Sequence, residues 1–162
     1  MGNPIQLGYR LNRGVYFSSS NDDFTDHFFE ASGEFEINSR NRFELLAQYE
    51  DGHEDRGTGF SIGTGNEIET PDTFKSSVIG TEYSYGALTS NGMITFKASR
   101  ESLDYDRNEG DYIYRDRIKT KVGAEFAYRI APSTALVLDV TEIYNRYDEQ
   151  ESATFSLSLI HI

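Results

Sequence analysis

The sequence lacks cysteine and tryptophan, has no long apolar run, and carries few basic residues for its acidic content. Without cysteine, disulfide bonds contribute nothing to its stability. Without an apolar run of about 20 residues, no membrane-spanning helix is predicted. Because 15 Lys and Arg stand against 27 Asp and Glu, the composition argues against a nucleic-acid partner, which requires an excess of basic residues.

Tyrosine and phenylalanine, by contrast, are abundant, with 11 of each among 162 residues. The modest hydrophobic content of 37% does not exclude a membrane protein. In a transmembrane β-barrel the lipid-facing residues occupy alternate positions, so the apolar signal of each segment is diluted by half. The length suits one domain, and we treat residues 1–162 as a single barrel domain or barrel segment.

The clearest pattern covers residues 112–130, where two kinds of side chain alternate. Apart from Asp116, one set is apolar, small or aromatic, with the aromatic residues near its ends: Tyr112, Tyr114, Ile118, Thr120, Val122, Ala124, Phe126, Tyr128 and Ile130. The other set is largely charged: Arg115, Arg117, Lys119, Lys121, Glu125 and Arg129. Strict period two predicts one long strand. Aromatic residues at both ends of an apolar stripe are typical of a strand that crosses a bilayer.

Alternation and turn residues together predict seven further strands or partial strands. The eight predicted strands are 5–19, 27–37, 42–50, 74–86, 93–103, 112–130, 135–147 and one from 152 onward. The short turns at 38–41, 86–92 and 131–134 alternate with mostly longer acidic connections at 18–26, 51–73, 104–111 and 148–151. Leu103 and Tyr105 break parity with Phe96, which predicts a β-bulge. The fold class predicted is an all-β, antiparallel up-and-down transmembrane β-barrel, with about eight strands forming part of a larger barrel.

This arrangement assigns side chains to two environments. The predicted aromatic girdle at the membrane interfaces is Phe17, Phe29, Tyr49, Tyr83, Tyr85, Tyr114, Phe126, Tyr128 and Tyr144. The predicted lumen-lining residues are Arg115, Arg117, Lys119, Lys121, Arg129, Glu34, Glu44, Glu82 and Glu125. In a wide barrel the basic and acidic walls would create a transverse field that orients polar solutes. In a narrow barrel the same groups would have to pair, because isolated buried charges are costly.

Two motifs resemble catalytic or metal sites, and both lack the context that such chemistry requires. Residues 59–63 match G-x-S-x-G, but no helix pattern follows Ser61, and a nucleophile elbow requires a strand-to-helix turn. Asp104, Asp106 and Asn108 resemble the start of a calcium loop, but Arg115 stands where the closing Glu belongs. We therefore predict no enzyme activity, no catalytic residue, no metal site and no cofactor.

The run from Tyr49 to Gly59 and the Arg115-Asp116-Arg117 entry into a strand resemble the β-barrel porin family found in exopolysaccharide and capsule operons. The resemblance implies a Gram-negative outer-membrane barrel with more strands than this chain supplies, serving polysaccharide export or solute passage. The partners we expect are outer-membrane lipid and lipopolysaccharide, with polysaccharide or small polar solutes as cargo. The absence of an export signal before the first strand and of a terminal aromatic residue predicts a fragment.

Three alternatives remain open from the sequence. Residues 157–162 resemble a translated sequencing adapter, although an apolar strand end has the same appearance. The chain could also form a small closed outer-membrane barrel with a structural or surface-binding role. A soluble β-sandwich or lipocalin-like binder would instead bury Phe35, Val122, Ala124 and Phe126 in its interior.

Overall fold

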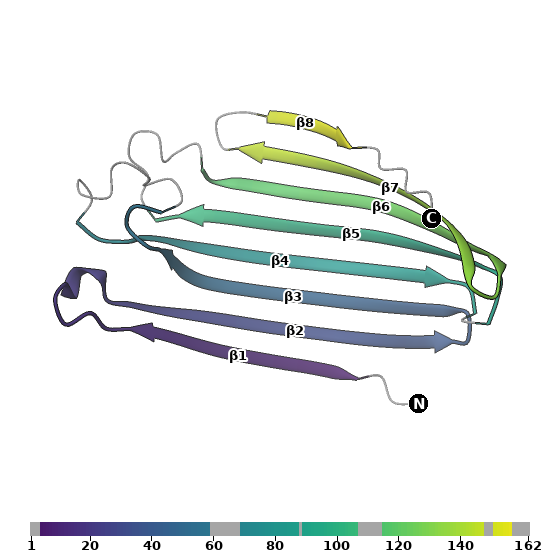
Figure 1. The fold of residues 1–162 in the computed structure, drawn as a ribbon, viewed down its shortest axis with the longest axis horizontal. Coiled ribbons are helices and arrows are strands. Elements are labelled where there is room, and N and C mark those ends of the chain that lie inside the picture. Colours follow the sequence, from purple (N-terminus) through teal and green to yellow (C-terminus); the bar gives the residue numbers. More distant parts are fainter. Residues whose placement is uncertain (1–3, 59–68, 88, 107–114, 148–150, 157–162) are drawn as a thin grey trace.

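The computed structural model describes residues 4–58, 69–87, 89–106, 115–147 and 151–156, the last of these by its backbone alone. Eight strands form one antiparallel sheet in which each strand pairs with its neighbour in the sequence (Figure 1). The strands are β1 (Ile5–Gly14), β2 (Phe24–Asn38), β3 (Asn41–Glu54), β4 (Asp72–Tyr85), β5 (Gly92–Tyr105), β6 (Arg117–Ala131), β7 (Thr134–Tyr147) and β8 (Glu151–Ser156). A short 3-10 helix, η1 (Ser20–Asp22), lies between β1 and β2.

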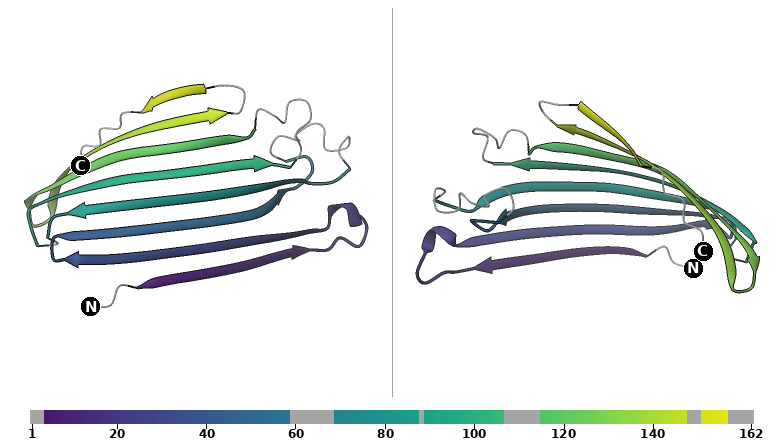
Figure 2. Two further views of the ribbon diagram at one scale, coloured as in Figure 1. Left: turned by 180° about the vertical axis from the view of Figure 1, so that it is seen from behind. Right: turned by 45° about the horizontal axis from the view of Figure 1, so that its top comes forward.

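The predicted antiparallel up-and-down order is confirmed, but the sheet is not closed into a barrel. β1 and β8 lie at opposite edges (Figure 1). Strands β2 to β7 have 14 or 15 residues each. Strands of globular proteins usually have about 5–6 residues, so these are long enough to extend about 45–50 Å at 3.4 Å per residue. The sheet is also curved, with the β6–β7 hairpin bending out of the plane of the other strands (Figure 2).

The connections differ between the two ends of the sheet, as the sequence predicts. The three turns β2–β3, β4–β5 and β6–β7 are short and share one end, which we call the short-turn end. The connections β1–β2, β3–β4, β5–β6 and β7–β8 share the other, which we call the long-loop end. Gly86 begins the β4–β5 turn with φ of +138°, a conformation that favours glycine. A Cβ there would lie 2.7 Å from the Gly92 carbonyl oxygen.

Two predicted strands are too long. β1 ends at Gly14 rather than at residue 19, because the chain turns into a loop in which the backbone N–H of Tyr16 donates to Asp23. Phe17, predicted as an outward-facing strand residue, lies in this loop and is fully exposed. β6 begins at Arg117 rather than at residue 112, so Arg115 and Asp116 precede the strand. Residues 112–114 lie outside the described part of the chain.

The predicted bulge near Leu103 is wrong. The pairing of β4 with β5 runs without a shift from Phe74 opposite Tyr105 to Tyr85 opposite Ile94. Leu103 and Tyr105 differ in parity from Phe96 because their side chains lie on the other face of the sheet. There they are buried against neighbouring side chains. In the described register the shifts occur elsewhere, at Glu36/Asn38 and Arg129/Ala131, beside two of the short turns.

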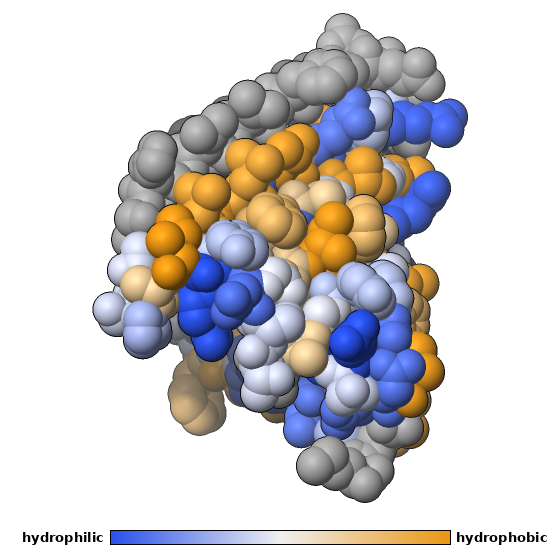
Figure 3. Space-filling model, turned by 90° about the vertical axis from the view of Figure 1, so that its right-hand side faces the viewer, coloured by the Kyte–Doolittle hydropathy of each residue, from blue (hydrophilic) through white to orange (hydrophobic). Residues whose placement is uncertain are grey.

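The two faces of the sheet differ in polarity. The apolar face is exposed, whereas a soluble domain buries its apolar face. The face that contains the side chains of Leu7, Phe29, Ile79, Phe126 and Leu138 is largely apolar, and all five are exposed. We call it the apolar face, and the opposite one the polar face. Leu103 and Tyr105 are the only hydrophobic residues buried in the described part of the chain. In an end-on view, hydrophobic and hydrophilic side chains gather in separate zones (Figure 3). This sheet therefore has almost no hydrophobic core of its own.

Candidate functional site

Aromatic side chains form two groups on the apolar face, one towards each end of the strands. Cross-strand partners lie side by side in each group. The group towards the long-loop end contains Tyr9, Phe29 and Tyr49 on β1 to β3, and Tyr144 on β7. The ring centroids of Tyr9 and Phe29 are 4.7 Å apart, and those of Phe29 and Tyr49 are 6.3 Å apart. The group towards the short-turn end contains Phe35, Phe43, Tyr83, Tyr85, Phe96, Phe126 and Tyr128.

The two aromatic groups are separated by a band of mainly small and aliphatic residues, in which Arg100 on β5 and Glu142 on β7 also lie. Phe29 and Phe35 stand six residues apart on β2, as do Phe43 and Tyr49 on β3, a separation of roughly 20 Å along a strand. Between them lie Ala31, Leu45, Ala47, Ile79, Ala98, Val122 and Ala124. The predicted girdle residues that the structure describes as strand residues all lie on this face. Tyr114 lies outside the described residues.

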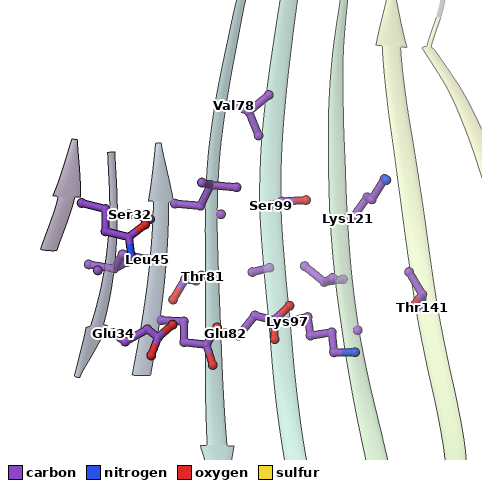
Figure 4. A pocket seen from close by; sticks show the side chains of 18 of the residues that line it. Ser32, Glu34, Leu45, Val78, Thr81, Glu82, Lys97, Ser99, Lys121 and Thr141 are labelled. Carbon is purple, nitrogen blue, oxygen red and sulfur yellow. The ribbon is translucent and has the colours of Figure 1, made fainter. Parts of the chain in front are cut away.

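The polar face contains a hollow of about 660 Å³ at the middle of the sheet (Figure 4). The hollow exists because two adjacent rows of cross-strand partners contain several small residues. Ser32, Gly80, Ser99 and Gly123 all line it. A Cβ on Gly123 would lie 2.8 Å from the hydroxyl oxygen of Thr141, so this glycine leaves room for the side chain of the neighbouring strand.

Three glutamates lie side by side in one of these rows, and we call them the acidic row. Glu34 pairs with Glu44, and Glu44 pairs with Glu82, so the three residues lie at the same level on β2, β3 and β4. Figure 4 shows Glu34 and Glu82 of this row. All three are exposed and line the hollow. Like charges about 6 Å apart repel by roughly 0.7 kcal/mol in water and by more in a drier medium. The row is therefore tolerable only where water reaches it.

Lys97 follows the acidic row on β5, but it is already engaged with acids on its other side. Its Nζ lies 2.7 Å from Oε2 of Glu125 and 3.9 Å from Oδ2 of Asp139. Lys121 also lines the hollow. Carboxylates thus outnumber ammonium groups here, and the centre of the polar face is acidic.

The predicted basic stripe is shorter than expected. Arg117, Lys119 and Lys121 alternate along β6 on the polar face, and Nη2 of Arg117 lies 3.9 Å from Oε1 of Glu101. Arg129 lies near the short-turn end beside the register shift and is exposed. Arg115 precedes β6 and is not a strand residue. It is 2% exposed and pairs with Glu54 and Asp72, which stand 61 and 43 residues away in the sequence.

Sequence reasoning missed both acidic partners of Arg115. Glu54 ends β3 and Asp72 begins β4, so the two residues flank one long connection and lie opposite each other in the register. No local pattern links them to Arg115. The one signal in the sequence is the position of Arg115 next to a strand, at the end of the sheet where the loops are rich in carboxylates.

The long-loop end also contains ion pairs in which residues of the connections take part. Arg56, which follows β3, donates to Asp22 in η1, and this hydrogen bond holds the pKa of the Asp22 carboxyl below its usual value. Asp106, which follows β5, accepts hydrogen bonds from the Thr73 hydroxyl at 2.7 Å and from Lys75 at 3.0 Å. These two donors, Thr73 first, lower the pKa of Asp106.

The remaining motifs do not assemble into a reactive site in the described residues. Ser61 and the rest of the G-x-S-x-G match lie outside them, as does Asn108 of the calcium-like run. The described residues contain no group of three or more His, Cys, Asp or Glu side chains placed to hold a metal ion. No helix in the described part of the chain is long and apolar enough to span a membrane.

Comparison of the chain with protein-family models, with curated proteins and with solved structures finds no match.

Proposed function

We propose that this chain forms part of the wall of an outer-membrane β-barrel channel, with the apolar face towards lipid and the polar face lining a water-filled lumen. The observation that carries the proposal is the exposure of the apolar face. Fully burying one large apolar side chain is worth about 1.5–3 kcal/mol, and this sheet leaves a whole face of them in contact with its surroundings. In a hydrocarbon environment, the free-energy cost of exposing these apolar side chains to water does not arise.

The distribution of aromatic residues supports a bilayer in particular. Two aromatic groups on either side of a band of mainly small and aliphatic residues follow the layout of outer-membrane barrels, in which aromatic girdles flank an apolar belt about 25 Å tall. With strands tilted by about 40°, the roughly 20 Å between the two groups on β2 and β3 corresponds to about 15 Å of depth. The aromatic side chains and the residues beyond them supply the rest.

The polar face supports a hydrated lumen rather than a filled one. Interiors of small closed barrels are packed with side chains, whereas here serine and glycine leave a hollow and the acidic row remains exposed. This disfavours the small closed barrel. Val122 and Phe126, two of the residues that a soluble binder would enclose, are exposed in this sheet. Additional strands beyond β1 and β8 would complete such a barrel.

The charge pattern supports passage of polar solutes through the lumen. Acidic side chains of β2 to β4 face one part of it, and Arg117, Lys119 and Lys121 of β6 face another. Opposed charges of this kind produce a transverse field that favours polar and zwitterionic solutes over apolar ones. Sugars, oligosaccharide segments of an exported polymer and small ions fit this chemistry.

Conductance in planar bilayers tests the proposal on the full-length protein. We expect ion-conducting channels from the wild type, and a shift of permeability away from cations in the triple variant Glu34→Gln, Glu44→Gln, Glu82→Gln. The matched control is Glu36→Gln, an exposed glutamate on the same face near the short turn. A protein that stays soluble without detergent and forms no channels would contradict the proposal.

A further inference from the structure

Five of the six non-glycine residues that are buried in the described sheet gather at the long-loop end of the polar face, and the sixth, Thr95, lies near the short-turn end. Leu103, Tyr105, Asp72, Arg115 and Asp116 are all 9% exposed or less. Their surroundings contrast with the open hollow only a few residues away along β5. We call these five residues, together with Glu54 and Phe74, the Arg115 cluster.

The strand register places the cluster on the polar face. Leu103 and Tyr105 share the parity of Lys97 and Ser99 on β5, which line the hollow. Glu54 and Asp72 are opposite each other and share the parity of Glu44 and Glu82. Phe74 is opposite Tyr105, and their ring centroids are 5.7 Å apart.

Arg115 packs onto the polar face, over the ring of Tyr105. Its guanidinium carbon lies 3.6 Å from the centroid of the Tyr105 ring. Its Nη2 donates to Oε2 of Glu54 at 2.8 Å, and its Nη1 donates to Oδ2 of Asp72 at 3.2 Å. The Tyr105 hydroxyl donates to Oε1 of Glu54 at 2.7 Å, so the same carboxylate holds both the arginine and the ring beneath it.

The backbone next to Arg115 is fixed as well. Asp116 accepts a hydrogen bond from the backbone N–H of Tyr105 at 2.7 Å. Residues 115 and 116 therefore lie against the end of β5 before the chain enters β6 at Arg117. Just before β6, Arg115 therefore lies over the polar face and does not extend away from the end of the sheet.

We infer that the Arg115 cluster is the constriction of the proposed channel and limits its conductance at the long-loop mouth. This inference rests on the proposed function, because only a lumen lined by the polar face would be narrowed by residues folded onto it. The constriction is steric in character. The charge of Arg115 is opposed by Glu54 and Asp72, and the groups below it, Phe74, Leu103 and the Tyr105 ring, are apolar or aromatic.

The first test compares single-channel conductance in the full-length protein. We expect Arg115→Ala to raise conductance roughly twofold, since the cluster loses the guanidinium that holds Glu54, Asp72 and the Tyr105 ring together over the polar face. The control Arg40→Ala, which removes an exposed arginine in the β2–β3 turn at the opposite end, is expected to leave conductance unchanged. Equal conductance of wild type and Arg115→Ala would overturn the inference, whereas a wild type without channels would instead refute the proposed function.

A second variant covers the case in which Arg115→Ala does not fold with two acids left unpaired. The triple change Glu54→Gln, Asp72→Asn, Arg115→Ala removes these three charges together, while Asp116 keeps its hydrogen bond from the backbone N–H of Tyr105. Its conductance is expected to rise with unchanged ion selectivity, because the acidic row is intact. A change of selectivity without a rise of conductance would contradict a steric constriction.

Site-specific labelling gives an independent measurement, which the absence of native cysteine makes unambiguous. In Ser99→Cys the only thiol lies in the hollow. We expect a bulky charged thiol reagent to react several-fold more slowly from the long-loop side than from the short-turn side. Adding Arg115→Ala should remove this difference. Equal rates from both sides in Ser99→Cys alone would overturn the inference.

Discussion

The Arg115 cluster and the central hollow lie on the same face of the same strands, but the charged side chains are buried and paired in the cluster and exposed in the hollow. In the cluster, Arg115 and Asp72 are almost fully buried and each is engaged by partners. In the hollow, Glu34, Glu44 and Glu82 lie beside one another in an exposed row. The difference indicates that the cluster charges maintain structure, whereas the hollow charges are available to whatever enters.

Removing one carboxylate from each region gives the sharpest test of this contrast and the largest expected effect. Asp72→Ala should destabilise the protein by about 3–5 kcal/mol, because Arg115 would remain buried with one acid fewer. Glu44→Ala should cost less than about 1 kcal/mol or be stabilising, because it relieves repulsion within the acidic row. Urea unfolding in detergent micelles, followed by far-UV circular dichroism, measures both. Similar losses for the two variants would contradict the assignment.

The two faces of β3 provide the second test. Ala47→Arg places a charge in the middle of the apolar face and should cost about 2–4 kcal/mol in a bilayer. Gln48→Arg places the same charge on the polar face, next to Glu30, and should be nearly neutral. Folding yield into lipid vesicles, read by heat-modifiable gel mobility, compares the variants. If Ala47→Arg is tolerated as well as Gln48→Arg, the apolar face does not contact lipid.

The smallest expected effect concerns the exposed pairs at the long-loop end. Because its hydrogen bonds with Thr73 and Lys75 lower the pKa of Asp106 in the folded protein, ionised Asp106 stabilises the folded state. That contribution is complete above its usual pKa of 3.8 and is lost as the pH falls through the lower folded value. Wild type should exceed Asp106→Asn in unfolding midpoint at pH 6 by a small margin that disappears near pH 2. A margin that grows on acidification would contradict this sign.

The strand order and the alternation of faces were predictable from the sequence because they depend on local patterns. A period of two sets the face of each side chain, and short runs such as Asn38 to Asn41 mark the turns. Glu34, Glu44 and Glu82, all predicted to share the polar side of their strands, lie on one face of the sheet.

The same local reasoning failed where a pattern continued past the end of a strand. Alternation runs from residue 112 through Arg115 without interruption, so the sequence predicts a strand there. Tertiary partners at Glu54 and Asp72 draw Arg115 out of the strand and onto the polar face. Similarly, the parity of Tyr105 suggests a bulge until its contacts with Phe74 and Arg115 explain why an aromatic ring faces the polar side.

By itself, the sequence determined that this chain forms a long-stranded antiparallel sheet with one apolar and one charged face, because side-chain direction alternates with every residue. Only the tertiary structure decided which charges stand together in the acidic row and which are buried around Arg115. Those groupings depend on strand register and on contacts between residues more than forty positions apart. The local sequence pattern specifies neither the register nor these contacts.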